Sequence, residues 1–476
     1  MDNIGLATGE IFLLCAICAI LIGDLFLSES RRSMVYLLSQ LSLVITLILT
    51  WIAAPDSGTA TAFGGSFVVD PMSKICKSWI LVVSIGVFLY SRDYLNARRI
   101  MKGEYYTLAL SGVLGMMIMV SSSTMLTLYL GLELLSLSLY ALVALNRTDE
   151  RSSEAAMKYF VLGALASGAL LYGISMIYGA TGSLHFDAIA AKLGEDSSST
   201  AAVFGLAFVV VGIAFKFGAA PFHMWVPDVY DGAPTSVTLY ISSAPKIAAF
   251  ALAMRFLVDG LETTHGSWQG MLIVLSVLSI VIGNVIALAQ VSIKRMLAYS
   301  TISHVGFILM GILAGTDQGY SASMFYAITY ALTSMGAFGI LLAMDRAGVD
   351  INLLTDLRGL FRRSPVYAAV MMILLVSMTG VPPTVGFYAK LAVLNAVVQV
   401  DLVWLAVVAV VFSVVGAFYY LRVIKYMFFD EPAETQAVTS ALDVQLGLTI
   451  NGAAMILFGI FPGLIMAACV AAIAAG

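Results

Sequence analysis

The stretch 202–222, AVFGLAFVVVGIAFKFGAAPF, joins a long apolar run to one lysine and a Gly-Ala-Ala-Pro ending. A helix of about 20 mostly apolar residues crosses the ~30 Å hydrocarbon core of a bilayer, because each residue rises about 1.5 Å. Pro221 has no N–H and frees the carbonyl four residues before it. This stretch predicts a membrane-spanning helix that is broken near Pro221, with Lys216 deep inside the bilayer.

The remainder of the chain has the same character. Of its 476 residues, 61% are hydrophobic and 11% charged, and the mean hydropathy is +0.98. About a quarter of the residues of a soluble globular protein are charged, so this composition excludes that class. Fourteen spans of ~20 residues would use ~280 residues, which is roughly the apolar content of the chain. The sequence therefore predicts an all-α polytopic membrane protein with about 14 transmembrane helices.

Polar or glycine-rich joints separate the fourteen spans. The spans cover residues 10–28, 34–54, 72–91, 105–122, 124–145, 155–179, 202–222, 234–254, 268–290, 296–315, 320–344, 366–391, 400–421 and 442–470. Joints after odd-numbered spans hold sixteen of the 24 lysines and arginines, whereas the other joints and the termini hold only Lys192 and Arg255. Because basic loops face the cytoplasm, both termini are expected on the periplasmic side of a bacterial cytoplasmic membrane. Lys74 and Lys77, near the start of the third span, are expected to snorkel to the interface.

Helices 4–8 look repeated in helices 9–13. Met157-Lys158-Tyr159 is matched by Met324-Phe325-Tyr326 at an offset of 167 residues, and Lys216 is matched by Lys390 at an offset of 174. Five helices is an odd number, so the second copy is inverted in the membrane, and matching breaks near Pro221 and at Pro382-Pro383 point to the functional site. Chance similarity between Ala- and Leu-rich helices is the alternative. The expected divisions are 1–104 for helices 1–3, 105–258 and 268–430 for the two repeats, and 431–476 for helix 14.

Ionisable side chains inside the predicted spans are the candidates for function. Each costs about 2.5–3.5 kcal/mol at the bilayer centre on insertion scales, so five of them are expensive for a purely structural purpose. The candidates are Glu133, Lys158, Lys216, Lys246 and Lys390, with His304 as a sixth polar group. The simpler alternatives are that Glu133 only pairs with a lysine, that Lys158 snorkels, and that His304 is a satisfied core histidine.

Lysine suits a proton-loading site because burial favours its neutral amine, whereas a nearby carboxylate restores the ammonium. A row of lysines with one histidine and a switchable glutamate therefore predicts a proton relay. Sodium would require several oxygen ligands, and only one clear carboxylate lies mid-membrane in the predicted spans. Further prolines, including Pro245, follow Pro221 closely and favour hydrated breaks near the relay.

Motifs for bound cofactors are missing from the sequence. It has no G-x-G-x-x-G and no Gly-Lys-Ser/Thr phosphate loop. Its four cysteines are Cys15, Cys18, Cys76 and Cys469, and an iron–sulfur cluster or structural zinc needs about four suitably placed ligands. The cysteines are therefore interpreted as ordinary buried thiols, and no redox centre, nucleotide site or metal is expected in this chain.

Three motifs carry a family resemblance. They are Gly131-Leu-Glu-Leu-Leu-Ser-Leu137, Lys216-Phe-Gly-Ala-Ala-Pro-Phe-His-Met-Trp-Val-Pro-Asp-Val-Tyr230, and Gly232-Ala-Pro-Thr235 leading to Lys246. The chain resembles the antiporter-like membrane subunits of respiratory complex I, the proton-translocating NADH:quinone oxidoreductase. Related cation/proton antiporters usually continue Pro-Asp-Ala, whereas this chain has Pro-Asp-Val-Tyr.

The resemblance implies a role for each candidate residue. Glu133 matches a glutamate that modulates a lysine, Lys216 a proton-loading lysine, Lys246 a connecting lysine, His304 a connecting histidine, Lys390 an exit lysine, and Lys158 a further lysine of helix 6. Which lysine pairs with Glu133 stays open.

The resemblance also implies partners. The other membrane subunits of complex I would surround this chain in the bilayer, including related antiporter-like subunits and small membrane subunits, and no nucleic acid is involved. NADH oxidation and quinone reduction, with FMN, iron–sulfur clusters and quinone, would belong to partner subunits. A cation/proton antiporter and a non-transporting scaffold subunit remain as alternative functions.

Overall fold

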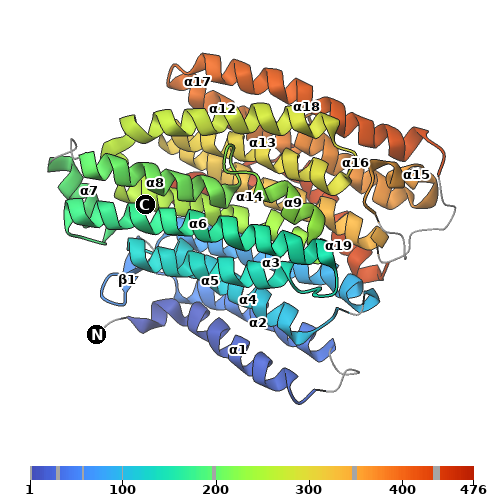
Figure 1. The fold of residues 1–476 in the computed structure, drawn as a ribbon, viewed down its shortest axis with the longest axis horizontal. Coiled ribbons are helices and arrows are strands. Elements are labelled where there is room, and N and C mark those ends of the chain that lie inside the picture. Colours follow the sequence, from blue (N-terminus) through green and yellow to red (C-terminus); the bar gives the residue numbers. More distant parts are fainter. Residues whose placement is uncertain are drawn as a thin grey trace.

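The structure is a computed structural model that describes residues 3–27, 33–55, 58–98, 100–195, 200–345, 351–432 and 440–475. Four of the basic joint residues counted above, Arg31, Arg32, Arg99 and Arg346, lie outside the described residues. Long helices run side by side along one direction (Figure 1). Thirteen helical stretches in the described part are long and apolar enough to cross a membrane, and three shorter apolar helices accompany them. The predicted all-α membrane fold is confirmed.

The helices have these bounds in chain order. They are α1 Thr8–Asp24, α2 Ser33–Ala53, α3 Pro71–Ala97, α4 Gly103–Val120, α5 Met125–Val143, α6 Glu150–Thr181, α7 Phe186–Glu195, α8 Thr200–Phe217, α9 Trp225–Gly232, α10 Thr235–Ser242, α11 Ala244–Ala253, α12 His265–Ala289, α13 Ile293–Leu313, α14 Asp317–Asp345, α15 Leu360–Arg363, α16 Pro365–Thr379, α17 Val385–Gln399, α18 Val403–Phe429, α19 Leu442–Ile460 and α20 Gly463–Ala474. A two-stranded antiparallel hairpin, β1 (Ala60–Ala62) and β2 (Phe67–Val69), joins α2 to α3. A π-helical turn, η3 (Met254–Gly260), extends α11.

Several passes through the molecule are built from more than one helix. The seventh consists of α8 and α9, the twelfth of α16 and α17, and the fourteenth of α19 and α20, so the described helices make fourteen passes. The expected broken helices 7 and 12 are present, although α9 lies beyond the predicted end of span 7 at residue 222. The eighth pass is interrupted at Ser243, two residues before Pro245. The short helix α7 was not expected. The expectation of four buried thiols is wrong for Cys15 and Cys18, which are exposed on α1, whereas Cys76 and Cys469 are buried.

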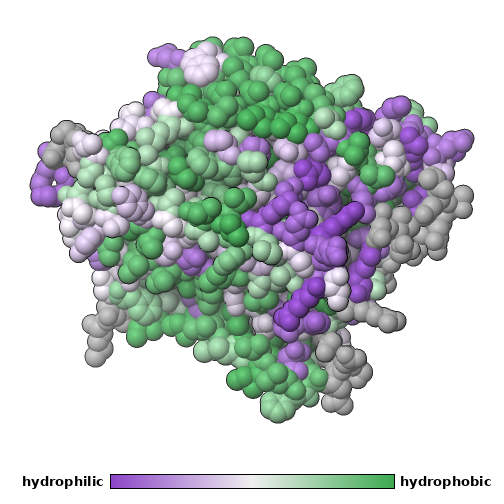
Figure 2. Space-filling view, viewed as in Figure 1, coloured by the Kyte–Doolittle hydropathy of each residue, from purple (hydrophilic) through white to green (hydrophobic). Residues whose placement is uncertain are grey.

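Joints gather at two opposite ends of the molecule, as alternating passes require. A cavity of about 640 Å³ is lined by residues from the joints after passes 3, 5, 7, 9 and 11, among them Arg98, Arg151 and Lys294; we call this the basic end. A second cavity, of about 670 Å³, is lined by joints after passes 2, 4, 6, 8 and 10 and by the chain's last helix; we call this the terminal end. The hydrophilic surface is most extensive toward the basic end, on the right of Figure 2. The count of fourteen passes is therefore consistent with the charge pattern.

The breaks in passes 7 and 12 have the same construction. α8 is followed by Gly218 at φ +78°, and α16 by Gly380 at φ +88°, a left-handed conformation that glycine adopts without steric cost. Pro221 and Pro383 each follow three residues later, at an offset of 162 residues. Lys216 precedes its break by two residues, whereas Lys390 follows its break by ten, so the two lysines are not equivalent positions.

Two buried ionic clusters were not expected. Lys77 does not snorkel: it is 2% exposed, and its Nζ lies 2.5 Å from Oε1 of Glu10 on α1. At the terminal end, Arg255 in η3 lies 2.7 Å from Asp70 and 2.8 Å from Asp259. Burial alone would raise the pKa of Asp70, the residue that caps α3, but the charge of Arg255 and hydrogen bonds from Ser73 hold this pKa below its ordinary value.

Candidate functional site

Glu133 lies in the middle of α5, nine residues after Thr124, which caps the helix. One of its carboxylate oxygens accepts a hydrogen bond from Ser167 Oγ on α6, and Ser167 lies 3.2 Å from Tyr129 Oη. Among the described residues, Glu133 forms no direct ion pair with any lysine. Lys216 reaches the same helix at Ser136, three residues after Glu133.

Lys216 lies at the end of α8, next to the break. Its Nζ donates to Ser136 Oγ of α5 at 2.7 Å, and Ser136 Oγ itself donates to the carbonyl of Leu132 at 2.6 Å. The lysine thus reaches across to the helix that carries Glu133, but it ends one helical turn away from that carboxylate. The serine between them was not identified as a functional residue from the sequence.

Lys246 lies in α11 and is buried at 1% exposure. Its Nζ donates to the carbonyl of Phe217 at 2.8 Å. That carbonyl ends α8, and Pro221 has no N–H with which to satisfy it. Lys216 and Lys246 line one cavity of about 20 Å³ together with Tyr159 and Trp225, and this volume has room for about one water molecule. The structure therefore brings these two predicted lysines together.

Lys390 in α17 repeats the arrangement of Lys246 at the second break. Its Nζ donates to the carbonyl of Thr379, the last residue of α16, at 2.9 Å, and to Ser413 Oγ on α18 at 3.3 Å. Pro383 stands four residues after Thr379, so this carbonyl too lacks its usual helical donor. In both halves a lysine ammonium lies at the carboxyl-terminal end of a broken helix, where the helix dipole favours positive charge.

His304 in α13 has hydrogen-bond partners on both ring nitrogens. Nδ1 lies 2.7 Å from Tyr326 Oη on α14, and Nε2 lies 3.2 Å from Tyr420 Oη on α18. Tyr420 Oη lies 2.5 Å from Ser300 Oγ. Lys390 Nζ lies 5.1 Å from the ring centroid of Phe307, which is three residues after His304 in α13. It is thus a satisfied buried histidine, and it also stands beside a predicted relay lysine.

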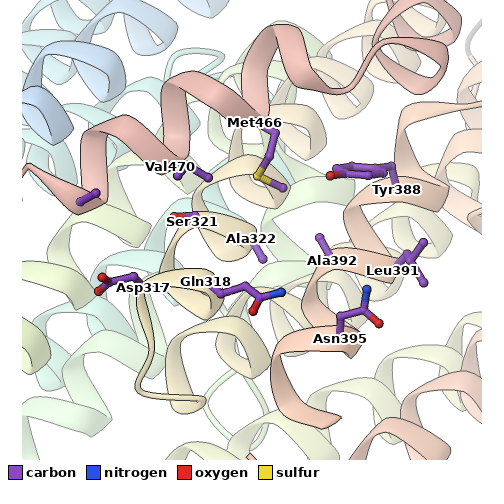
Figure 3. A pocket seen from close by; sticks show the side chains of 11 residues that line it. Asp317, Gln318, Ser321, Ala322, Tyr388, Leu391, Ala392, Asn395, Met466 and Val470 are labelled. Atoms are coloured by element: carbon purple, nitrogen blue, oxygen red, sulfur yellow. The ribbon is translucent and has the colours of Figure 1, made fainter. Parts of the chain in front are cut away.

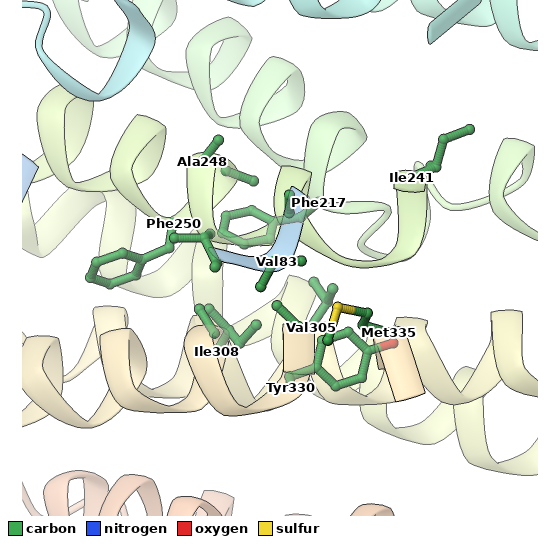
Figure 4. Packing of buried hydrophobic residues seen from close by; sticks show 14 of the residues in the cluster. Val83, Phe217, Ile241, Ala248, Phe250, Val305, Ile308, Tyr330 and Met335 are labelled. Carbon is green, nitrogen blue, oxygen red and sulfur yellow. The ribbon is translucent and has the colours of Figure 1, made fainter. Parts of the chain in front are cut away.

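Buried apolar side chains lie beside Lys246 in the first predicted repeat and beside His304 in the second. Figure 4 shows Phe217, whose carbonyl accepts from Lys246, on one side and Val305 and Ile308, of the helix that carries His304, on the other, with Val83 drawn between them. These four side chains are completely buried in the hydrophobic core. His304 does not line the cavity that Lys216 and Lys246 share; it lines a different one with Tyr326 and Tyr330.

Lys158 lies apart from the other candidates. It is eight residues into α6, about 12 Å from the start of that helix at the basic end, and its side chain is 45% exposed. Its Nζ lies 2.8 Å from Glu154 and 2.9 Å from Asp228 of α9, which in turn lies 2.9 Å from Arg295 of α13. Asp228 was quoted above only as part of a motif, and here it joins α6, α9 and α13.

The groove in Figure 3 lies between α14, α17 and α20 and has a volume of about 450 Å³. α17 lines it with Tyr388, Leu391, Ala392 and Asn395, which share one face of the helix. Lys390 projects from the opposite face, toward the break. The groove is therefore separate from the row of lysines.

The residues that could not be identified from the sequence are those on neighbouring helices that bond the candidate side chains. Ser136, Ser167, Tyr326 and Tyr420 hold the charged and histidine side chains, and each is an ordinary residue of an apolar helix. The spacing of Ser136 from Glu133, three residues on one helix face, is the one local signal that was available. Within the described ranges, no group of three or more His, Cys, Asp or Glu side chains is arranged to hold a metal ion.

The arrangement of fourteen passes, two broken helices and buried lysines is that of an antiporter-like membrane subunit. A family model described as "NADH:quinone oxidoreductase/Mrp antiporter, TM" matches residues 122–416, so the chain belongs to this family. Within it, the chain belongs with the N subunits of NADH-quinone oxidoreductase. It is 57% identical to subunit N of Thioalkalivibrio sulfidiphilus, over 98% of this chain and 97% of that protein.

Other relatives agree with this assignment. Subunit N of Thiobacillus denitrificans is 54% identical, with 98% of this chain and 97% of the relative covered. A chain of respiratory complex I from Thermus thermophilus with bound aureothin superposes with a TM-score of 0.84 at 31% identity, with 98% and 100% covered. A chain of the Mrp complex from Dietzia sp. gives a TM-score of 0.86 at 19% identity, with 99% and 97% covered, and shows that it shares the fold.

Proposed function

We propose that this chain is a proton-translocating membrane subunit of a bacterial respiratory complex I. High identity to subunit N over nearly the full length supports the assignment to that complex. NADH oxidation and quinone reduction, with FMN, iron–sulfur clusters and quinone, then take place in partner subunits. The chain contacts the lipid bilayer, related antiporter-like subunits and small membrane subunits. Its basic end faces the cytoplasm, and both termini face the periplasm.

The proposed path for protons is a relay through Glu133, Lys216, Lys246, His304 and Lys390. The observation that carries it is the cavity of about 20 Å³ that Lys216 and Lys246 share. Two ammonium groups at one small buried cavity repel each other, so loading one with a proton favours release from the other. Lys158, with its partner Asp228 near the basic end, belongs to the approach to this relay.

The proposed relay has two segments, because the cavity that Lys216 and Lys246 share is not lined by His304. Lys216 and Lys246 belong to the first predicted repeat, 105–258, and His304 and Lys390 to the second, 268–430. Helices 1–3 (1–104) and helix 14 (431–476) then flank the two repeats. Coupling to quinone reduction requires water or side-chain movement between the two segments during turnover, because Lys246 and His304 line different cavities and protons do not pass through packed hydrocarbon.

Replacing the lysines at the shared cavity tests this function. Lys216→Met and Lys246→Met keep the apolar stem and remove the ammonium, so coupled NADH:quinone reductase activity and proton pumping are expected to fall at least tenfold in the assembled complex. Lys192→Met is the matched control, because Lys192 is an exposed residue of α7 whose one ion pair among the described residues is with Glu195.

Normal pumping by an assembled complex carrying either cavity variant would contradict the relay and favour a scaffold function. Sodium-dependent transport by the chain would favour the antiporter alternative.

A further inference from the structure

Ser136 lies between the two charged groups with which the proposed relay begins. It follows Glu133 by three residues in α5, so the two side chains share a helix face about 4.5 Å apart along the axis. Lys216 Nζ donates to Ser136 Oγ at 2.7 Å, whereas Glu133 accepts from Ser167 on the neighbouring helix. Each charged group is thus held by its own serine hydroxyl.

The bond between Lys216 and Ser136 is well placed to fix the lysine. Ser136 is 2% exposed, and both residues line the small cavity shared with Lys246. Hydrogen bonds to charged groups contribute about 1.5–3 kcal/mol. Among the described residues, Ser136 is the one acceptor of a hydrogen bond from Lys216. The hydroxyl therefore determines where the ammonium lies.

We propose that Ser136 is a positioning residue that holds Lys216 one helical turn away from Glu133. This inference rests on the proposed function, in which Lys216 loads and releases a proton. In direct contact with Glu133, the ammonium would be held in a buried ion pair and would give up its proton reluctantly. On the serine, Lys216 stays within reach of the carboxylate charge. When it releases a proton, the electron pair of the N–H bond remains on Nζ, and the proton passes to a water molecule in the cavity or to the amine of Lys246.

Ser136→Ala tests the positioning role. Lys216 then loses its acceptor and turns to Glu133, so the alkaline limb of the pH profile of coupled NADH:quinone reductase activity moves up by about one pH unit or more. Proton pumping at pH 7 is expected to fall several-fold. Ser138→Ala is the matched control: Ser138 is also buried in α5, but its hydroxyl donates to the carbonyl of Leu134 in its own helix. Its pH profile is expected to match that of the unmodified complex.

Further variants separate positioning from packing. Ser136→Thr keeps a hydroxyl and is expected to restore the original pH profile. In Ser136→Ala combined with Glu133→Gln, Lys216 has no carboxylate to turn to, so the profile is expected to match that of Glu133→Gln alone. If Ser136→Ala prevents assembly, Ser136→Cys carries the test, because a thiol is a weak acceptor and is expected to give an intermediate shift.

An assembled Ser136→Ala complex whose pH profile coincides with that of Ser138→Ala would overturn the positioning role. The same holds for Ser136→Cys with an unshifted profile. These outcomes differ from failure of the proposed function, since in that case Lys216→Met itself would leave pumping normal.

Discussion

Replacing Gly131 with alanine tests how closely α4 and α5 must approach to place Glu133. A Cβ at Gly131 would lie 2.7 Å from the nitrogen of Met119, 2.8 Å from the carbonyl oxygen of Gly115 and 3.1 Å from Cα of Met119. All three atoms belong to the backbone of α4, so no side chain can rotate away. The ordinary lower limit of such contacts is 3.4 Å, and α5 must therefore move by roughly 0.7 Å.

Overpacking of this kind costs about 1–3 kcal/mol, and the better helix propensity of alanine returns up to about 1 kcal/mol. A net loss of about 1 kcal/mol corresponds to a roughly fivefold lower ratio of folded to unfolded protein, and Glu133, two residues along the same helix, moves with the backbone. Membranes containing the variant complex can be heated for fixed times, and the remaining coupled NADH:quinone reductase activity and pumping measured.

The matched control for this experiment is Gly168→Ala in α6, where a Cβ would meet nothing within 4 Å. This variant is expected to be as heat-resistant as the unmodified protein or more so. If the Gly131 and Gly168 variants lose activity at the same rate and turn over equally well, the close contact of α4 and α5 does not position Glu133.

Three further predictions concern the remainder of the molecule. Lys77→Met leaves the Glu10 carboxylate buried without its partner, so the thermal stability of the complex should fall by the equivalent of about 3–5 kcal/mol, and Glu10→Gln in the same chain should recover most of it. Because the pKa of Asp70 is lower in the folded state than its ordinary value of 3.8, the Asp70 carboxylate stabilises the fold above that pH, and this stabilisation is lost as the pH falls below 3.8. In heat-inactivation assays, the stability difference between Asp70→Asn and the original protein should therefore shrink below about pH 4. In a cysteine-free background, an impermeant thiol reagent outside the cytoplasmic membrane should label Ala188→Cys and spare Asn352→Cys, and labelling of both from that side would contradict the orientation.

Local signals in the sequence located the breaks and the deep lysines. Pro221 and Pro383 remove backbone donors wherever they occur, and a lysine such as Lys216 within an apolar run is costly whatever its neighbours are. These features depend on one helix at a time, so they could be predicted from residues alone. The alternation of basic and non-basic joints likewise depends only on the order of the helices along the chain.

Features that depend on two helices were not predictable in this way. Whether Lys77 meets Glu10 or reaches the interface is decided by the rotation of α1 against α3, which no local pattern states. The same applies to Lys158, whose partner Asp228 lies on a short helix that the hydropathy pattern did not separate from the break. The serine under Lys216 belongs to this group as well, because its importance arises only when α8 packs beside α5.

The lysines at the two helix ends have a consequence for what the chain can release. A carbonyl oxygen without a backbone donor at a helix terminus is a binding site for a cation, and in a membrane protein a mobile metal ion can occupy such a site. Here the carbonyls of Phe217 and Thr379 are occupied by the side chains of Lys246 and Lys390, which are covalently part of the chain. A lysine ammonium group cannot diffuse away, so the ion that it can release is its proton. In the proposed relay, sodium and potassium ions are therefore excluded from these two carbonyls because lysine side chains of the protein itself occupy them.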